Sequence, residues 1–423
     1  MRSKYPAAWL VLFALAPFQA GATLGVFEHG AGIKSMGDGG ISYVAPEETT
    51  AIAANPASAI VLGRRFDLGM DLIMPDARAS IFGNSLGPDQ TNDSNVHHYY
   101  PIPQGGITLP LSDRWSAGAS VYAGGLGPDY SSSPYARFAS PTNASQSQSA
   151  SLTLKITGLS LVLANAIRPG QALGLALNIQ HEAVNVKGLA PFEAFSQSPG
   201  NVTDNGKHGA LGGSITAGWT GTITPWMSGG VSYRSKSWSR HIEAYSGLLP
   251  DAGLLELPAI YGAALALTPL PKLQIAIEFQ RADYGSRHAF GNGVEELGQG
   301  KLLGSADGPG FGWGDQNAYK LGLSYQLTPS LRLRGGYVYN TLNFAPSETL
   351  FNLLAPATLK NHYTAGATWA FRNRYELSGY AALAPRHQIS GLNSIPPALG
   401  GGEANVSNEL FMVGLSLERR FGK

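Results

Sequence analysis

Apolar and polar residues alternate along most of the chain with a period of two. Leu321 and Leu323, for example, alternate with Lys320 and Ser324. This period is typical of a β-strand whose two faces meet different surroundings. Because one face carries charged side chains, we expect that face to meet water and the other face to meet an apolar medium. Such strands, repeated along a chain, are typical of a transmembrane β-barrel with lipid outside and a polar lumen inside.

The alternation predicts fourteen strands between residue 64 and the end of the chain, with boundaries good to a few residues. The chain therefore belongs to the all-β class. The predicted strands lie at about residues 64–76, 97–110, 114–124, 149–166, 171–187, 209–222, 226–245, 254–268, 271–285, 316–327, 330–342, 359–371, 374–385 and 408–421.

The connections between the predicted strands alternate strictly between very short and long. An even number of antiparallel strands with short periplasmic turns and long outer loops is the pattern of bacterial outer-membrane barrels. A soluble β-sandwich, the alternative, would not sort its connections by length in this way. We therefore expect a transmembrane antiparallel β-barrel in the outer membrane of a Gram-negative bacterium. The short connections are residues 111–113, 167–170, 223–225, 269–270, 328–329 and 372–373.

Residues 1–22 have the features of a secretory signal peptide. Arg2 and Lys4 form a basic start, residues 7–16 are apolar, and residues 20–22 are small, as the cleavage rule requires. The apolar run is too short to span a membrane as a helix. We therefore expect the chain to be exported and the peptide to be removed.

Aromatic residues cluster near the predicted short turns. Trp115, Trp226 and Tyr375 are examples, and such residues form girdles at membrane interfaces. The last predicted strand places Phe421 near its end. A terminal Phe is common in outer-membrane barrels, where the barrel-assembly machinery reads it, so we expect this machinery to be a partner.

The composition fits a lipid-facing barrel. Charged residues make up only 13% of the chain, against about 25% in soluble domains. The 29 Lys and Arg nearly balance the 28 Asp and Glu, so the charge does not indicate a nucleic-acid partner. The absence of cysteine excludes disulfides and thiolate metal sites.

Residues 23–63 lack the alternation and are rich in Gly and Ala, which indicates a separate N-terminal segment. The motifs Gly32–Gly37, Glu47-Glu48 and Ala54–Ala57 in this segment resemble the FadL/TodX family of outer-membrane transporters of hydrophobic compounds. Further motifs similar to this family follow along nearly the whole mature chain. They are Tyr233-Arg234-Ser235, Leu257-Pro258, Trp313 with Asp315 and Tyr319, and Gly335-Gly336-Tyr337.

The resemblance implies a fourteen-stranded barrel whose lumen is plugged by an N-terminal hatch, here residues 23–63. It implies passive uptake of hydrophobic small molecules, such as long-chain fatty acids or hydrocarbons, without a cofactor or an energy source. Outer loops would capture the ligand and pass it to a lumenal pocket near the hatch. The ligand would then leave laterally into the lipid bilayer beside a kinked third strand. We expect the protein to be a monomer.

Four positions in the predicted hatch stand out. The motif Asn55-Pro56-Ala57 predicts a turn, because Pro fixes φ and Asn binds its own backbone. We expect this turn to anchor the hatch to the barrel wall rather than to contact ligand. Glu28, Glu47 and Glu48 need partners if they are buried, and lumenal Arg or Lys could supply them. The alternative for these carboxylates is a solvated surface role.

A cluster of glycines and a proline ends the third predicted strand. Glycine weakens a strand, and proline removes a donor from the ladder. The cluster therefore predicts the kink and the lateral opening that the resemblance implies, with an ordinary loop entrance as the alternative. Its members are Gly124, Gly125, Gly127 and Pro128.

Basic residues on the lumen-facing side of the strands are candidate contacts for a ligand carboxylate. The alternative is that they brace the hatch against the wall through ion pairs. The fifth strand carries Gln180-His181-Glu182 at the place where we would look for an arginine in a fatty-acid transporter. Neutral hydrocarbons therefore stay open as substrates. The candidate contacts are Arg234, Lys236, Lys320, Arg332 and Arg334.

Two enzyme-like motifs occur outside the settings that their chemistry requires. Gly83–Gly87 matches the spelling of a nucleophile elbow but lies in a predicted outer loop, not between a strand and a helix. His97 and His98 point to opposite faces of a strand and cannot bind one metal together. We therefore expect no catalytic residue, no metal and no cofactor. An outer-membrane lipid hydrolase and a general porin are the alternative functions.

Overall fold

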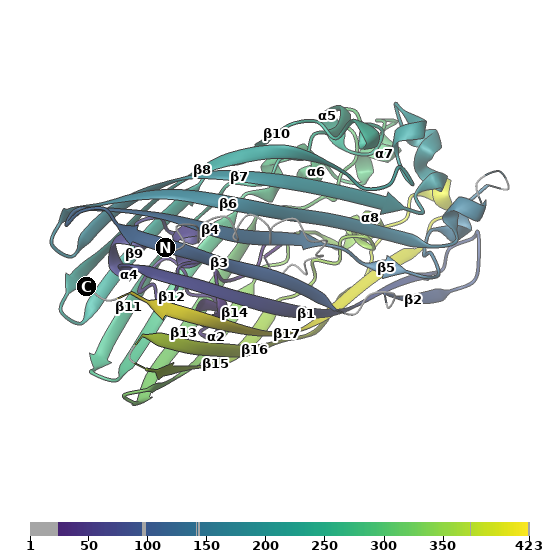
Figure 1. Ribbon diagram of the computed structural model, residues 1–423. Coiled ribbons are helices and arrows are strands. Elements are labelled where there is room, and N and C mark those ends of the chain that lie inside the picture. Colours follow the sequence, from purple (N-terminus) through teal and green to yellow (C-terminus); the bar gives the residue numbers. More distant parts are fainter. Residues whose placement is uncertain (1–23, 95–98, 141, 143, 373, 422–423) are drawn as a thin grey trace, which may run out of the picture.

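The computed structural model describes residues 24–421 apart from 95–98, 141, 143 and 373. Its named strands form one antiparallel sheet, which closes on itself because the first strand pairs with the last. Fourteen long strands make up the wall of this barrel, as the alternation predicts (Figure 1). The predicted signal peptide, residues 1–22, and the pair His97-His98 lie outside the described residues.

Each long strand pairs with the long strands that precede and follow it in the chain. Three short strands extend the wall at the end with the long loops: β2 (Gln90–Ser94), β5 (Asp129–Tyr130) and β10 (Trp238–Ser239). The long strands are β1 (Arg65–Phe82), β3 (Tyr100–Pro110), β4 (Trp115–Leu126), β6 (Ala150–Arg168), β7 (Gln171–Lys187), β8 (His208–Thr224), β9 (Met227–Arg234), β11 (Ile260–Leu270), β12 (Leu273–Ala282), β13 (Gln316–Thr328), β14 (Leu331–Asn340), β15 (Asn361–Phe371), β16 (Tyr375–Ile389) and β17 (Glu403–Arg420).

Some predicted strand boundaries are wrong. The strand predicted at 226–245 ends at Arg234, and β10 resumes the pairing with β8 only after residues 235–237. By contrast, β1 and β17 extend beyond their predicted ends and stay paired up to Phe82 and Glu403. Their mutual pairing therefore continues towards the outer loops, past the residues where the alternation of apolar and polar positions becomes irregular.

The strand predicted at 254–268 begins only at Ile260. The residues before it run as irregular chain beneath the outer loops, where Leu255 and Leu257 are buried in the apolar core. These apolar residues suggested a longer strand, but they serve to fill the core and do not pair with a neighbouring strand.

The two faces of the wall are as the alternation predicts. Leu323 and Leu333 point outward and are 44% and 40% exposed, whereas Ser324 points inward and is 5% exposed. Trp115 and Trp226 are exposed beside short turns, where an aromatic girdle is predicted. Large apolar side chains exposed on the outer face are what a lipid-facing barrel requires.

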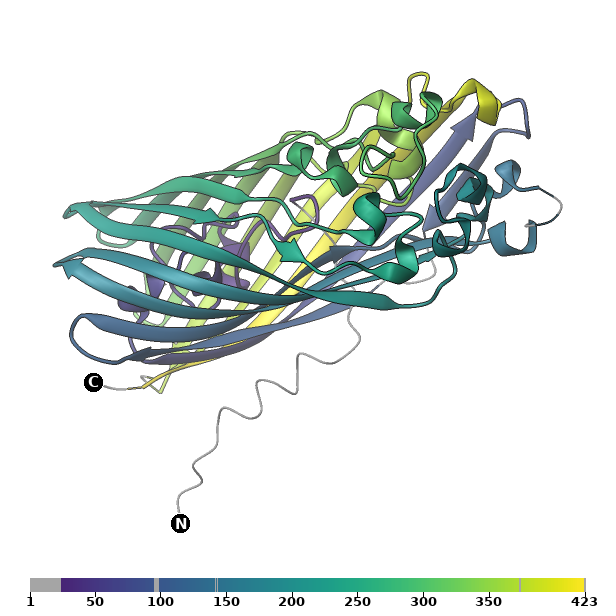
Figure 2. The ribbon, with the colours of Figure 1, turned by 90° about the horizontal axis from the view of Figure 1, so that it is seen from above.

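Residues 24–63, hereafter the N-terminal segment, lie inside the barrel towards the end with the short turns (Figure 2). The segment contains three short helices: α2 (Ile33–Gly37), α3 (Ala51–Ala54) and α4 (Ser58–Leu62). Helix α2 contacts β14 to β17, while α3 and α4 contact β4 and β6. The segment therefore touches opposite parts of the wall.

Short helices and turns fill the long loops at the other end of the barrel (Figures 1 and 2). These loops cover a contiguous apolar core. Within the described part of the chain, none of the helices is both long enough and apolar enough to cross a membrane. The loop helices are η1 (Ala136–Phe138), η2 (Ala144–Ser147), η3 (Ala190–Phe195), η4 (Pro199–Asn201), η5 (Glu243–Tyr245), α5 (Pro250–Gly253), η6 (Tyr284–Ser286), α6 (His288–Gly291), α7 (Glu295–Gly298), η7 (Pro346–Glu348), α8 (Thr349–Asn352) and η8 (Pro397–Leu399).

Candidate functional site

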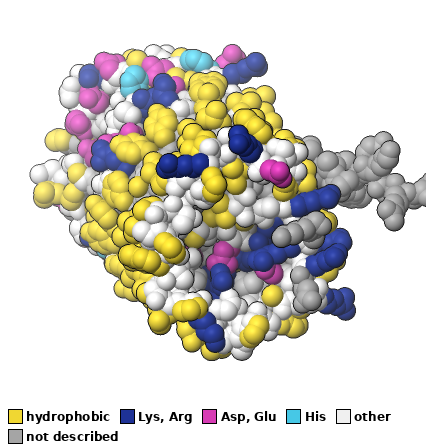
Figure 3. Space-filling model, turned by 90° about the vertical axis from the view of Figure 1, so that its left-hand side faces the viewer, with side chains coloured by type: hydrophobic (Ala, Val, Ile, Leu, Met, Phe, Trp, Pro, Cys, Tyr) yellow, Lys and Arg dark blue, Asp and Glu magenta, His cyan; other side chains and the backbone are white. Residues whose placement is uncertain are grey.

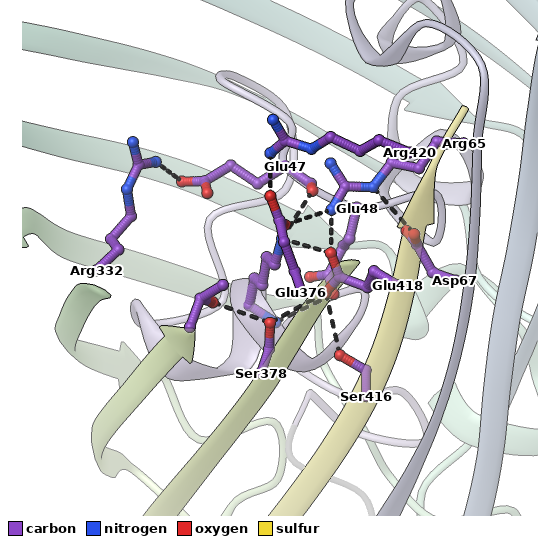
Figure 4. A network of polar contacts seen from close by, with 12 residues as sticks. Glu47, Glu48, Arg65, Asp67, Arg332, Glu376, Ser378, Ser416, Glu418 and Arg420 are labelled. Atoms are coloured by element: carbon purple, nitrogen blue, oxygen red, sulfur yellow. Dashed lines mark hydrogen bonds and ion pairs between the residues drawn. The ribbon is translucent and has the colours of Figure 1, made fainter. Parts of the chain in front are cut away.

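A network of charged side chains ties the N-terminal segment to the barrel wall (Figure 4). Lys34 on α2 forms ion pairs with Glu376 on β16 and with Glu418 on β17. Arg65, at the start of β1, pairs with the same two carboxylates and with Asp67. All five residues are buried. Removing one partner would leave a buried charge uncompensated, so this network fixes the segment at the seam where the barrel closes.

Glu47 attaches the N-terminal segment at a second place. Its carboxylate oxygens lie 2.6 Å from guanidinium nitrogens of Arg332 and Arg334, both on β14. Burial alone would raise the pKa of Glu47, but the two guanidinium groups lower this pKa to about 2. Two predicted ligand contacts, Arg332 and Arg334, therefore brace the segment against the wall.

The other two acidic residues of the predicted hatch have different surroundings. Glu48 accepts hydrogen bonds from the backbone N–H groups of Lys34, at 3.1 Å, and Ser35, at 2.8 Å. Glu28 borders a cavity instead. Burial, reinforced by the nearby carboxylate of Asp71, raises the pKa of Glu28. The sequence suggests a lumenal Arg or Lys partner for each of these carboxylates. Within the described residues, neither Glu28 nor Glu48 forms such an ion pair.

The motif Asn55-Pro56-Ala57 forms the turn that the sequence predicts. The side-chain oxygen of Asn55 accepts a hydrogen bond from the Ala57 N–H at 3.1 Å. The side-chain nitrogen of Asn55 donates to the carbonyls of Tyr43, at 2.7 Å, and Trp219 on β8, at 2.9 Å. This turn therefore connects the N-terminal segment to the wall through buried hydrogen bonds.

An inner cavity lies between the N-terminal segment and the wall. The space between its lining atoms, including the part open to solvent, amounts to about 790 Å³. Residues 27–32 line one side, and side chains from several strands line the other. Val121, Tyr122 and Ala123 all line it, although successive residues of a strand point to opposite faces. The cavity therefore reaches the edge of β4.

Two predicted ligand contacts, Arg234 and Lys320, border the inner cavity. The guanidinium of Arg234 lies 4.7 Å from the ring centre of Tyr122 and donates to the Ala53 carbonyl at 2.9 Å. Within the described residues it forms no ion pair. Lys320, in contrast, is paired with Glu278 at 2.8 Å. Arg234 is therefore the better placed of the two to meet an anionic ligand.

The ladder between β3 and β4 is broken partway along the wall. Pairing between these strands ends at Gly105 and Val121. Beyond this level β4 continues to Leu126 against β6, while β3 continues to Tyr100 against β1. Nearer the outer loops, the Tyr100 hydroxyl at the start of β3 donates a 3.3 Å hydrogen bond to the carbonyl of Gly127, just after β4. The wall thus has a bounded gap in its hydrogen bonding.

Residues on both sides of this break disfavour pairing. Pro101 and Pro103 on β3 have no backbone N–H to donate. On β4, Gly125 has a φ of 144°, which residues with side chains rarely adopt. The glycine and proline cluster for which the sequence predicts a kink is therefore located at the break. These residues are Gly124, Gly125, Gly127 and Pro128.

The N-terminal segment fills part of the break. The Val26 carbonyl accepts a hydrogen bond from the N–H of Gly125 at 2.7 Å. The Tyr284 hydroxyl holds the same stretch, because it donates to the Leu24 carbonyl at 2.9 Å and accepts from the Val26 N–H at 2.8 Å. Tyr284 in turn packs edge-on against Trp313. Residues 24–27 therefore connect the outer loops with the edge of β4.

An outer cavity lies beneath the long loops, with about 740 Å³ of open space. Among the described residues that line it, no side chain carries a charge, and the hydroxyl of Tyr135 donates a hydrogen bond to the Leu350 carbonyl. The apolar core around this cavity continues to Val26 and Leu126 beside the break. Packed apolar side chains therefore extend without interruption from the outer loops to the gap in the wall. The cavity lining includes Leu152, Val184, Phe192, Leu249, Phe351 and Leu354.

Sequence reasoning missed several residues of this site. Lys34 offered a usable signal, because a lone cation in a Gly-rich segment needs an acidic partner. Tyr122 and Tyr284 offered none, since their roles depend on contacts with distant parts of the chain. Lys236, the remaining predicted contact, is exposed and pairs with Glu256 at 2.9 Å, and it does not line the inner cavity.

The sequence matches the family model described as outer membrane protein transport protein (OMPP1/FadL/TodX) over residues 21–421. A comparison with curated proteins gives no significant match. Similar solved structures include the toluene transporter TodX of Pseudomonas putida, with a TM-score of 0.69 and 18% identity over 95% of this chain and all of that one.

The toluene transporter TbuX of Ralstonia pickettii has a TM-score of 0.63 and 15% identity, covering 93% of this chain and 99% of that one. A FadL homologue of Pseudomonas aeruginosa has a TM-score of 0.65 and 17% identity, covering 96% of this chain and all of that one. At these identities the likeness concerns the fold. Because the family model covers nearly the whole chain, the protein belongs to the OMPP1/FadL/TodX family of outer-membrane transport proteins.

Proposed function

We propose that this protein is a passive channel that takes up neutral hydrophobic small molecules across the outer membrane of a Gram-negative bacterium. Residues 23–63 act as a hatch that closes the lumen to water-soluble solutes. The ligand enters the outer cavity, moves to the inner cavity and leaves sideways through the break between β3 and β4. The channel works as a monomer.

The main support for this proposal is the outer cavity, whose described lining residues are uncharged, together with the packed apolar core that extends from it to the break. A hydrophobic ligand gains free energy wherever it leaves water. Along this route it passes from the loops to lipid without crossing an aqueous lumen. The concentration gradient can then drive uptake without an energy source.

The charge at the cavities favours a neutral ligand. A carboxylate would lose its hydration in the outer cavity and find no cation among the lining residues. Long-chain fatty acids are the second candidate ligand, and Arg234 at the inner cavity is the observation that favours them. We rank fatty acids second because the outer cavity, which an entering ligand meets first, offers no cation among its described lining residues.

Two features argue for a hatched channel over the alternative functions. A general porin needs an open lumen, whereas here buried ion pairs and hydrogen bonds hold the N-terminal segment against several strands. A lipid hydrolase of the nucleophile-elbow type needs its serine between a strand and a helix. The motif Gly83–Gly87 instead lies in the loop between β1 and β2, and no helix follows it there.

Uptake measurements in cells test the proposal. A strain without its own transporter would express the wild-type protein, and entry of a radiolabelled aromatic hydrocarbon, a long alkane and oleate would be compared. Phe351→Glu places a charge at the outer cavity. Leu392→Glu, at a loop residue that is 63% exposed, is the matched control.

We expect hydrocarbon uptake with the wild-type and Leu392→Glu proteins and strongly reduced uptake with Phe351→Glu. Heat-modifiable electrophoretic mobility would show that all three barrels are folded. Uptake of oleate alone would overturn the neutral ligand in favour of fatty acids. If none of the three compounds entered faster than in cells without the protein, the transport proposal would fail.

A further inference from the structure

Two arginines project from the lipid-facing side of the wall at its short-turn end. Arg419 has the same parity on β17 as Leu415 and Leu417, which are 65% and 50% exposed. Arg64 directly precedes β1 and shares the parity of Leu68, which is 43% exposed. Alternate residues of a strand share a face, and the Phe421 N–H continues the pairing of β17 with β1 by donating to the Arg64 carbonyl at 3.0 Å. Both cations therefore lie on the lipid-facing side of the wall, at the edge of the apolar band.

The two guanidinium groups share one aromatic ring. The guanidinium carbon of Arg419 lies 4.8 Å, and that of Arg64 5.3 Å, from the ring centre of Phe421. Arg419 also lies 5.5 Å from the ring centre of Tyr375, which stacks on Phe371. Cation–π contacts of this kind orient the guanidinium planes while their N–H groups stay available to an anion. The two arginines are therefore held in place together.

This pair of arginines keeps its positive charge among the residues that the structure describes. Neither arginine forms an ion pair with an acidic group in the part of the chain that the structure describes. Their inward-facing neighbour Arg420, in contrast, lies 2.5 Å from Glu376. Arg372 and Arg374, in the adjacent short turn, are also exposed. Figure 3, which looks onto this end of the barrel, shows Lys and Arg gathered around its rim.

We propose that Arg64, Arg419 and Phe421 form a binding site for the phosphate group of a phospholipid in the periplasmic leaflet. The guanidinium groups donate charge-assisted hydrogen bonds to the phosphate oxygens. The acyl chains of the same lipid lie along the exposed Leu415 and Leu417 of β17. The bound lipid then covers the seam where β1 and β17 close the barrel.

The side of the wall on which the two arginines lie favours a lipid over an acidic protein as the partner. A periplasmic protein would meet the turns, which point along the barrel axis. Arg64 and Arg419 instead project sideways, among leucines that meet acyl chains. The site is independent of the compound that the channel carries.

Native mass spectrometry of the full-length folded barrel in detergent, titrated with phosphatidylglycerol, tests this site. The test variant is the double substitution Arg64→Gln with Arg419→Gln. The matched control is Arg114→Gln with Arg168→Gln, which removes the same charge from exposed residues elsewhere on the same rim. Diacylglycerol, which lacks the phosphate, and inorganic phosphate are the two ligand controls. If the double variant fails to fold, Arg64→Gln alone, outside β17, takes its place.

We expect the test variant to bind the first phosphatidylglycerol about tenfold more weakly than the wild type, while the control variant is unchanged. Diacylglycerol should bind all three proteins equally weakly. Equal losses in both double variants would overturn the site in favour of diffuse rim charge. Unchanged binding in the test variant would also overturn it. Inorganic phosphate that binds as tightly as the lipid would mean that the site takes free anions, and the lipid assignment would be wrong.

Discussion

The backbone N–H of Gly125 donates a 2.7 Å hydrogen bond to the carbonyl of Val26. Strand β4 therefore bonds to the N-terminal segment at the level where it no longer pairs with β3. One segment thus occupies the lumen and also touches the break in the wall. We propose that this one segment both closes the lumen to water-soluble solutes and borders the exit towards lipid.

A side chain at Gly124 should displace Val26. A Cβ atom added to Gly124 would lie 2.6 Å from the Val26 carbonyl oxygen, closer than packing allows. Gly124→Ala should therefore weaken the hydrogen bond to Gly125. We expect faster amide exchange in residues 24–27, measured by hydrogen–deuterium exchange mass spectrometry.

Gly335→Ala is the control for this prediction, because its Cβ would meet only the Thr364 carbonyl at an ordinary 3.8 Å. Exchange in the N-terminal segment should stay as in the wild type for this variant. Equal acceleration in both variants would contradict the specific contact between Val26 and β4.

Removing the hydroxyl of Tyr284 should release the same stretch by another route. Tyr284→Phe keeps the ring packing against Trp313 but leaves the Val26 N–H without its partner. It also removes one of the two hydrogen bonds to the Leu24 carbonyl, which still accepts from the Phe27 N–H at 3.1 Å. Local stability should fall by about 1–3 kcal/mol, the cost of leaving buried polar groups unpaired. Amide exchange at Val26 reports the change.

Tyr245→Phe is the matched control, since the Tyr245 hydroxyl likewise bridges two backbone groups, those of Val186 and Gly206, under the outer loops. Its effect should stay near those residues. If Tyr284→Phe left exchange at Val26 unchanged, the proposed anchor would be wrong.

The Glu47 ion pairs should make closure of the lumen depend on acid pH. Burial opposes ionisation of Glu47, but Arg334 and Arg332 lower its pKa from 4.5 to about 2. A lowered pKa contributes stability above about pH 4.5, and this contribution is lost as the pH falls towards 2. We expect low ion conductance in planar bilayers at neutral pH and rising conductance under strongly acid conditions.

Glu47→Gln should conduct more than the wild type already at neutral pH, because both guanidinium groups lose their carboxylate. Glu193→Gln, a substitution in an outer loop, is the control and should behave like the wild type. Identical conductance of Glu47→Gln and wild type would show that this attachment does not keep the lumen closed.

An arginine placed on the outward face should destabilise the barrel more, the deeper it lies in the bilayer. Leu323→Arg should destabilise the barrel by about 2–4 kcal/mol, because Leu323 lies on the lipid-facing side within the apolar band. Leu327→Arg lies on the same strand and face but beside a short turn, so its cost should be near zero to about 1 kcal/mol. Folding titrations into lipid vesicles measure both values, and equal costs would contradict the assigned depth of β13.

The alternation predicted the barrel because residues two apart share a face, as Leu321 and Leu323 do. It also placed Arg332 and Arg334 on the inner face. The sequence suggested lumenal Arg or Lys as partners of the hatch carboxylates, and Glu47 does pair with Arg332 and Arg334. Which basic residues these are could not be predicted, since a period-two pattern gives the face of a residue but not what lies opposite it in the lumen. The contact from Val26 to Gly125 is beyond sequence reasoning for the same reason.

The kink illustrates what local chemistry can and cannot predict. Glycines at 124 and 125 indicate weak pairing wherever they occur in a strand. The observed break also needs Pro101 and Pro103 on the neighbouring strand. The combined effect depends on the register between β3 and β4, which the sequence does not specify.

Reversible closure of the break between β3 and β4 tests whether the ligand leaves sideways through it. The natural chain has no cysteine, so a pair introduced as Pro103→Cys and Ala123→Cys can be joined across the gap with a short bifunctional thiol reagent that contains a disulfide. The control pair, Leu109→Cys with Ala117→Cys, lies where the two strands already pair. We predict that joining the first pair stops hydrocarbon uptake while purified protein still binds the ligand, that reduction restores uptake, and that the control pair has no effect. Uptake that continues with the gap closed would contradict the sideways exit.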